Sequence, residues 1–167
     1  TDREAIERAV CDAFVESASY PVAMTTRRRA DEMRVAHAAG VPAAAQSTLR
    51  ADGGTRLESA IARAGTDATV TVLSDVGTDD SQPALSAFAA DHGIATLGNV
   101  PIEYDGVAYG VLTVGATHPD AFDERERAVF AELGQLLGTA IEASQTKQLL
   151  YATAVLELDL AVSADAE

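Results

Sequence analysis

Apolar side chains recur along the chain with two spacings, and each spacing predicts one kind of element. In residues 2–18 they follow one another three or four positions apart between acidic and basic residues, as in an amphipathic helix. The same spacing returns in short segments after Thr55 and Pro83, and in a long one from Asp123 to about residue 151. Strands are predicted from β-branched or apolar runs between turn residues, at 22–26, 34–39, 68–73, 94–102 and 107–116.

Residues that favour helix ends support these boundaries. Thr55 can cap a short helix that Gly65 stops, and Pro83 can open the next helix, which His92 and Gly93 close. Asp123 and Glu126 have the spacing of a capping box. At 1.5 Å per residue the last helix would be roughly 40 Å long, which is comparable with the diameter of the domain.

The order of helices and strands predicts an α+β domain with a largely antiparallel sheet. The Asp105-Gly106 pair favours a hairpin between the last two strands, and residues 27–32 predict a charged turn between the first two. Residues 155–162 alternate between apolar and polar positions, which predicts one more strand. We therefore expect one domain over 1–152, with 153–167 as the start of a following domain of a longer protein.

The charge of the chain restricts its surroundings. It has 12 basic and 26 acidic residues, a net charge of −14, and a hydrophobic content of 47% that is sufficient for a core. Repulsion between the excess acidic groups is screened by salt, so the charge suits a salt-adapted cytoplasm. The same charge excludes a basic nucleic-acid-binding surface. No apolar run is long enough to span a membrane and no signal-peptide pattern is present, which predicts a soluble, cytoplasmic protein with no membrane partner.

Motifs in the second half of the chain resemble those of a known family. The run Val100-Pro101-Ile102, the turn at Gly106, the strand from Tyr109 to Val114 and the segment from Phe122 to Glu126 resemble the second half of a GAF domain. The sequence of residues 119–122 and the end of the last helix resemble those of the GAF modules of bacterio-opsin-activator-type transcriptional regulators of halophilic archaea.

This resemblance implies a fold and a site. The fold would be a GAF-like antiparallel sheet with the N- and C-terminal helices on one face and a small-molecule pocket on the other, roofed by loops and short helices. DNA would be contacted only by a domain outside this chain. Since strand alternation does not decide which side chains point inward, a shift of one residue would exchange Met24 for Ala23 and His37 for Ala36 or Ala38. The residues expected to bind the ligand are Met24, His37, Phe88, His92, Asn99 and Thr113.

Other motifs carry no catalytic or metal chemistry in this interpretation. Cys11 is more typical of a small buried hydrophobe than of a redox or bilin-attachment residue, and methionine-sulfoxide-reducing relatives use several cysteines. His37, His92 and His118 share no metal-ligand spacing, and no nucleophile elbow occurs. Arg27–Arg29 could attract an anion, although a solvated hairpin tip is favoured because Asp31 and Glu32 follow. We expect no cofactor and no enzyme activity.

Three functional hypotheses follow, in decreasing order of preference. The first is a ligand-sensing regulatory module that binds an unknown small-molecule effector and signals through its last helix. The second is a ligand-free module for dimerisation, and the third is an enzyme of unknown reaction. A homodimer through helices 2–18 and 123–151 is expected in the first two cases. Gly134 and Gly138 lie one helical turn apart, which allows either the sheet or a partner helix to approach closely. The apolar Leu149 and Leu150 beyond them favour the partner helix.

Overall fold

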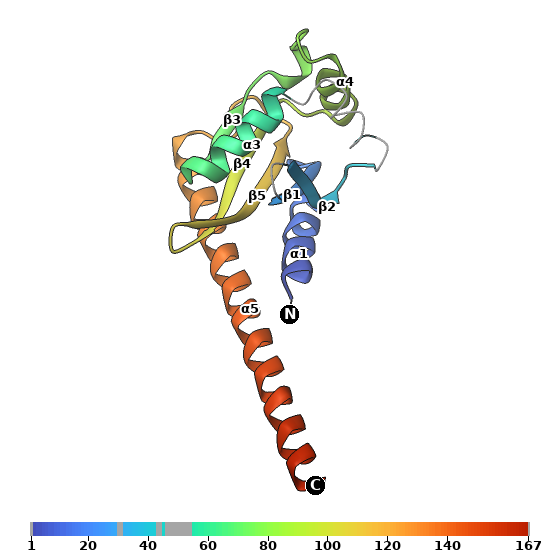
Figure 1. The fold of residues 1–167 in the computed structure, drawn as a ribbon. Helices are drawn as coiled ribbons and strands as arrows, with labels where there is room; N and C mark the ends of the chain where they lie inside the picture. Colours follow the sequence, from blue (N-terminus) through green and yellow to red (C-terminus); the bar gives the residue numbers. More distant parts are fainter. Residues whose placement is uncertain (1, 30–31, 43–44, 46–54, 167) are drawn as a thin grey trace.

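The computed structural model describes residues 2–29, 32–42, 45 and 55–166 (Figure 1). Its elements, in chain order, are α1 (Arg3–Val15), β1 (Val22–Arg29), β2 (Glu32–Ala39), α3 (Thr55–Asp67), β3 (Thr71–Leu73), the 3-10 helix η1 (Val76–Thr78), α4 (Pro83–His92), β4 (Thr96–Tyr104), β5 (Val107–Ala116) and α5 (Glu124–Ala166).

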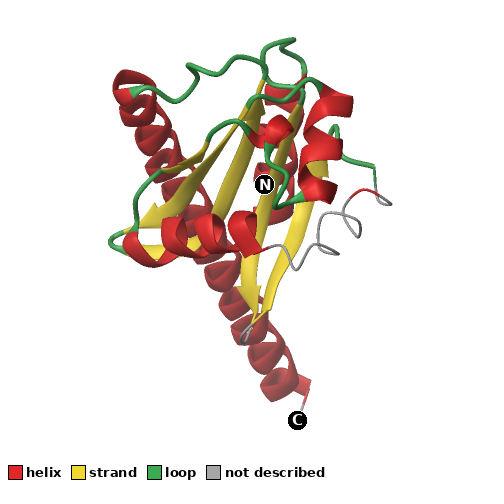
Figure 2. Ribbon diagram, turned by 90° about the horizontal axis from the view of Figure 1, so that it is seen from above, coloured by secondary structure: helices red, strands yellow, loops and turns green. Residues whose placement is uncertain are grey.

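The five strands form one sheet in the order β2-β1-β5-β4-β3, and every neighbouring pair is antiparallel. Helices α1 and α5 cover one side, here called the helix face, and α3 and α4 cover the other, the roof face (Figure 2). The predicted α+β fold, with the first and last helices together on one face, is confirmed.

On the helix face, an aromatic cluster joins α1 to the start of α5. The rings of Phe14 and Phe130 stack with centroids 5.7 Å apart, and Tyr20 packs edge-on to Phe14 at 5.4 Å. Phe122 reaches the same cluster, 5.0 Å from Phe130, and lies over Gly98, where a Cβ atom would come within 2.5 Å of its ring. A glycine is therefore required beneath Phe122.

The glycine pair of α5 has a structural role. A Cβ atom at Gly134 would lie 2.0 Å from the carbonyl oxygen of Pro101, and one at Gly138 would lie 1.9 Å from that of Glu103. These glycines let α5 lie directly on the backbone of β4, so the interpretation that they bring the last helix close to the sheet is confirmed.

The predicted capping box also forms at α5. The backbone N–H of Glu126 donates to Asp123 Oδ1 at 2.8 Å. In a standard capping box the carboxylate of Glu126 would accept from the backbone N–H of Asp123. Here it accepts from the backbone N–H of Phe122, one residue earlier, at 2.8 Å. Phe122 has φ +64°, a left-handed conformation that an aromatic residue rarely adopts, and this hydrogen bond helps to hold it.

Several boundaries differ from the predictions. Gly65 does not stop the short helix, because α3 continues through Asp67, and the strand expected from residue 68 begins at Thr71. Residues 27–29 and 32–33 belong to β1 and β2, so most of the expected charged turn is strand. The strand expected at 155–162 is wrong, because α5 continues as helix through Ala166. The segment has no glycine or proline after Gly138 and is rich in Leu and Ala, so nothing ends the helix. The domain boundary at 153 stays a prediction.

Candidate functional site

Strand register decides which of the predicted site residues share a face. Met24 pairs with Thr113 across β1 and β5, and Thr113 pairs with Asn99 across β5 and β4. Directly paired residues point to the same side of a sheet, and the neighbours Val22, Leu97 and Val111 pack in the core beneath α3 and α4. Met24, Asn99 and Thr113 therefore lie together on the roof face, as expected.

Three of the predicted residues line one small cavity beneath α4. Met24, Phe88 and Thr113 contribute to its wall together with Leu57, Leu85 and Leu97. Its free volume is about 20 Å³, enough for one water molecule. The cavity is almost entirely apolar, with the Thr113 hydroxyl as its polar side-chain group.

Asn99 lies beside this cavity and is fully buried. Its Oδ1 accepts a hydrogen bond of 2.8 Å from the Thr113 hydroxyl. Its Nδ2 has no hydrogen-bond partner in the described part of the chain. Because an unsatisfied buried amide is costly, this group is available for a bound water or ligand atom.

His92 supports the wall and does not line the cavity. Its Nδ1 lies 3.0 Å from the carbonyl oxygen of Phe88, one turn earlier in α4. The two rings are in contact, with centroids 4.2 Å apart. His92 therefore fixes the ring of Phe88 at the end of α4.

The structure places His37 on the opposite side of the sheet. It pairs with Thr25, whose other neighbour, Leu112, belongs to the core beneath α1 and α5. Its Nε2 lies 3.6 Å from Asp12 Oδ1 on α1. The assignment of His37 to the roof face is wrong by one residue, since Ala38 is the residue paired with Met24.

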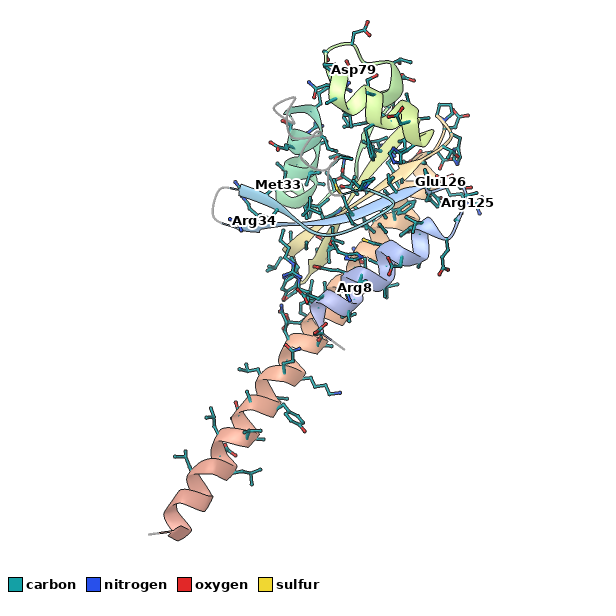
Figure 3. All side chains as sticks on the ribbon, turned by 90° about the vertical axis from the view of Figure 1, so that its right-hand side faces the viewer. Arg8, Met33, Arg34, Asp79, Arg125 and Glu126 are labelled. Atoms are coloured by element: carbon teal, nitrogen blue, oxygen red, sulfur yellow. The ribbon has the colours of Figure 1, made fainter. Side chains whose placement is uncertain are left out.

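A much larger hollow lies on the same roof face, on the other side of α3. This groove has a volume of about 760 Å³, within the range of small-molecule sites. One wall is α3, and the other is the adjoining ends of β1, β2 and β5; Met33 lies on β2 below α3 (Figure 3). Residues that line it are Thr26, Arg28, Met33, Glu58, Ser59, Ile61, Ala62, Gly65, Thr66 and Ala108–Val111.

Two β-bulges shape this groove, and the sequence pattern did not predict them. In β2, Thr25 pairs with His37 while Thr26 pairs with Val35, which leaves Ala36 as an extra residue. The bulge reverses the alternation beyond it and turns Met33 towards the groove. In β5 the extra residue is Tyr109, between Ala108 and Gly110. The sequence signal for this bulge is Gly110, where a Cβ atom would lie 2.5 Å from the carbonyl oxygen of Thr26.

Strands β1 and β5 carry polar contacts to the helices on the other face of the sheet. Arg27, between Thr26 and Arg28 of the groove, donates to the buried carboxylate of Glu7 on α1 at 2.7 Å. Glu7 also accepts from Arg3 Nε at 2.9 Å. The hydroxyl of the bulged Tyr109 donates to Glu142 on α5, and its carbonyl accepts from Arg3. The hydrogen bond to Glu142 raises the pKa of Tyr109 above its ordinary value.

Among the described residues are the side chains that metal binding and thiol chemistry would use. No group of three His, Cys, Asp or Glu side chains within them could hold a metal ion. Cys11 is buried, and this burial, with the nearby Asp12 and Glu7 carboxylates, raises its pKa from 9.0 to about 12. A thiol of this kind is inert at neutral pH. No helix in the described ranges is both long enough and apolar enough to cross a membrane.

The fold is that of a domain class in which a five-stranded antiparallel sheet has helices on both faces. A family model for the GAF domain matches residues 1–142, and the chain belongs to this family. The GAF domain/HD domain protein of Geobacter sulfurreducens is similar in structure, with a TM-score of 0.63 at 16% identity over 87% of this chain and 95% of that one.

Two further relatives differ in what they do. The free methionine-R-sulfoxide reductase of Neisseria meningitidis has a TM-score of 0.60 at 21% identity, over 87% of this chain and 81% of that enzyme. The fold is thus shared with an enzyme. A Haloferax volcanii protein described as a transcriptional regulator is 29% identical over 98% of this chain. The chain spans only 27% of the length of that halophilic relative.

Proposed function

We propose that this chain is the effector-sensing module of a transcriptional regulator, without catalytic activity, and that it signals through α5. A small molecule would bind on the roof face, and DNA would be contacted only by another part of the regulator. The regulator of Haloferax volcanii supports the setting. The observation that carries the proposal is the position of the groove, directly in front of the strands whose side chains contact α1 and α5.

The proposed signal passes through the sheet at two points. A ligand in the groove would contact Arg28 and Ala108, and the neighbouring residues Arg27 and Tyr109 hold Glu7 and Glu142 on the far side. A shift of either strand would change these hydrogen bonds. Because Glu142 lies on α5, the equilibrium position of that helix would then depend on occupancy of the groove.

A tryptophan reporter tests this route, since the sequence contains no tryptophan. With tryptophan in place of Leu150, on the exposed distal part of α5, an effector should raise the melting temperature and change the tryptophan fluorescence. Adding Tyr109→Phe keeps the ring of this groove-lining residue and removes only the hydroxyl bonded to Glu142, so it should keep the stabilisation and reduce the fluorescence change. Tyr104→Phe, on the exposed end of β4, is the matched control. Stabilisation with unchanged fluorescence in all three proteins would refute signalling through α5.

A second candidate function is dimerisation, and the outer side of α5 favours it. Val129, Leu136, Ala143 and Leu150 are exposed and follow one another at intervals of seven residues. An apolar residue at every seventh position fills one of the two seam positions of a coiled-coil heptad. We propose that two copies pair along α5, with or without an effector. If no small molecule stabilises the chain while it remains a dimer, dimerisation alone is its function.

A further inference from the structure

The walls of the groove carry opposite charges. Arg28 lies on the β1 wall and Glu58 on the α3 wall. Adjacent charged residues on the same two elements are paired, Arg27 with Glu7 and Arg56 with Asp79. Arg28 and Glu58 have no charged partner within the described part of the chain. The groove thus keeps one cation and one anion available on facing walls.

The remainder of the lining is apolar or carries hydroxyl groups. Met33, Ile61 and Val111 come from three different elements and present aliphatic or thioether surface to the groove. Ser59 and Thr66, on the same helix as Glu58, add hydroxyl groups to the α3 wall. A ligand that matches this lining has an apolar body and both a negative and a positive group.

We propose that the groove binds a zwitterion of the amino-acid type, with its carboxylate on Arg28, its ammonium group on Glu58 and its apolar side chain towards Met33, Ile61 and Val111. This inference rests on the proposed function and names the class of its effector. A volume of about 760 Å³ also admits a dipeptide. A simple anion would use Arg28 alone and leave Glu58 as a repulsive neighbour, and a simple cation would do the reverse.

The charges of the ligand should decide selectivity more than affinity. Both charged side chains are exposed to solvent, and an exposed ion pair contributes little in water. We therefore expect the loss of either charge to weaken binding by about two- to fivefold. Most of the affinity would come from the apolar surface that the ligand buries against Met33, Ile61 and Val111.

The test compares ligands that share one apolar body. L-leucine carries both charges, 4-methylpentanoate lacks the ammonium group, and 3-methylbutylamine lacks the carboxylate. Calorimetric titration of the 167-residue chain with each ligand, extended to L-phenylalanine and the dipeptide glycyl-leucine, should show the zwitterions binding more tightly than either singly charged analogue.

Two substitutions assign the charges. Arg28→Gln should weaken binding of L-leucine and 4-methylpentanoate and slightly strengthen that of 3-methylbutylamine, because the repulsion from Arg28 is removed. Glu58→Gln should show the opposite selectivity. Arg63→Gln and Asp67→Asn, exposed on α3 outside the groove, are controls for the net charge of the helix. Because all four residues are exposed, the variants should fold, which a thermal melt verifies.

The proposal is overturned if no zwitterion of the panel binds at millimolar concentration. It is also overturned if L-leucine binds both groove variants as tightly as it binds the original chain. Its failure is distinguishable from failure of the proposed function. A singly charged analogue that binds best and still alters the α5 fluorescence would refute the zwitterion and retain effector sensing. A zwitterion that binds with the expected charge selectivity but leaves α5 unchanged would support the groove assignment and refute the signalling route.

Discussion

Gly134 and Gly138 show how a single missing Cβ atom determines the position of a helix. In an exposed helix, glycine is about 1 kcal/mol less favourable than alanine, so two glycines in the middle of α5 weaken it locally. In return, the backbone of α5 lies against the carbonyl oxygens of Pro101 and Glu103. The same substitution that would strengthen a free helix should therefore weaken this domain.

Gly138→Ala is expected to lower the free energy of unfolding by about 2 kcal/mol or more, since the new Cβ atom overlaps backbone that has little room to move. Chemical denaturation measures this change. Ala140→Gly, on the exposed side of α5 and outside the seven-residue repeat, is the control and should cost only about 1 kcal/mol. An alanine at position 138 that stabilises the protein would show that α5 does not lie this close to β4.

Cys11 gives a prediction for high pH. Its pKa is about 12 in the folded chain against 9.0 for an ordinary thiol, so above pH 9 the unfolded state loses this proton first. Between about pH 9 and pH 12 the stability of the folded state should fall by up to about 1.4 kcal/mol per pH unit from this group, and below pH 9 it is unaffected.

The comparison that isolates Cys11 is a pair of pH titrations of stability, with the original chain and with Cys11→Ala. The variant should be less stable at neutral pH but lose less stability on going to alkaline pH. At neutral pH, the thiol of the folded protein should resist alkylation and react only after unfolding. Rapid alkylation of the native chain would contradict the burial of Cys11.

At the scale of elements, β-bulges account for what alternation alone could not predict. Regular alternation counted back from Val111 would place Tyr109 on the roof face, and the bulge directs its hydroxyl to Glu142 on α5. In β2 the prediction for His37 failed by one residue, because the sequence Val-Ala-His-Ala-Ala contains small residues that pack acceptably on either face. Met24, Asn99 and Thr113 were placed correctly, because their strands are regular where they pair.

The distal part of α5 leads to a prediction about assembly. Leu149, Leu156 and Leu160 are between 63% and 72% exposed, on a helix that runs well past the sheet (Figure 1). At 1.5 Å per residue its 43 residues span about 65 Å. A chain ending at Gln148 should keep its fold and shift from dimer to monomer in light scattering at high salt.

A point substitution provides the matched test in the full-length helix. Leu150→Glu should weaken the dimer because it places a charge in the seven-residue repeat. Lys147→Glu, one turn earlier and outside that repeat, should change the net charge in the same direction with less effect on assembly. If the original chain is a monomer throughout the micromolar range, the proposed α5 pairing is wrong.

At the scale of the whole molecule, charge is the dominant property. With a net charge of −14 over 167 residues, repulsion between acidic groups opposes the compact state, and salt screens it over about 10 Å at 0.1 M and about 3 Å at 1 M. Arg3 and Arg27 both pair with the buried carboxylate of Glu7, where α1 contacts the sheet. Two of the 12 basic residues are therefore used inside the fold.

The melting temperature should therefore rise from millimolar to molar sodium chloride. Differential scanning fluorimetry on tyrosine emission, or circular dichroism, measures it. A variant with several exposed acidic residues of α5 changed to their amides, such as Glu124→Gln and Glu132→Gln, should need less salt for the same melting temperature. Equal melting temperatures at both extremes would contradict the repulsion argument.

The sequence by itself determined most elements of this domain up to residue 151 and their order, because these depend on local periodicity and on the apolar surface that each element must bury. The face of the sheet taken by the terminal helices was expected only from the resemblance to GAF domains. Tertiary structure alone decided where the hollows lie. The expected pocket residues Met24, Phe88 and Thr113 surround a cavity for one water, while the ligand-sized groove opens beyond α3. Cavity volume depends on how α3 crosses the sheet and on two bulges, and both follow from contacts between residues far apart in the chain.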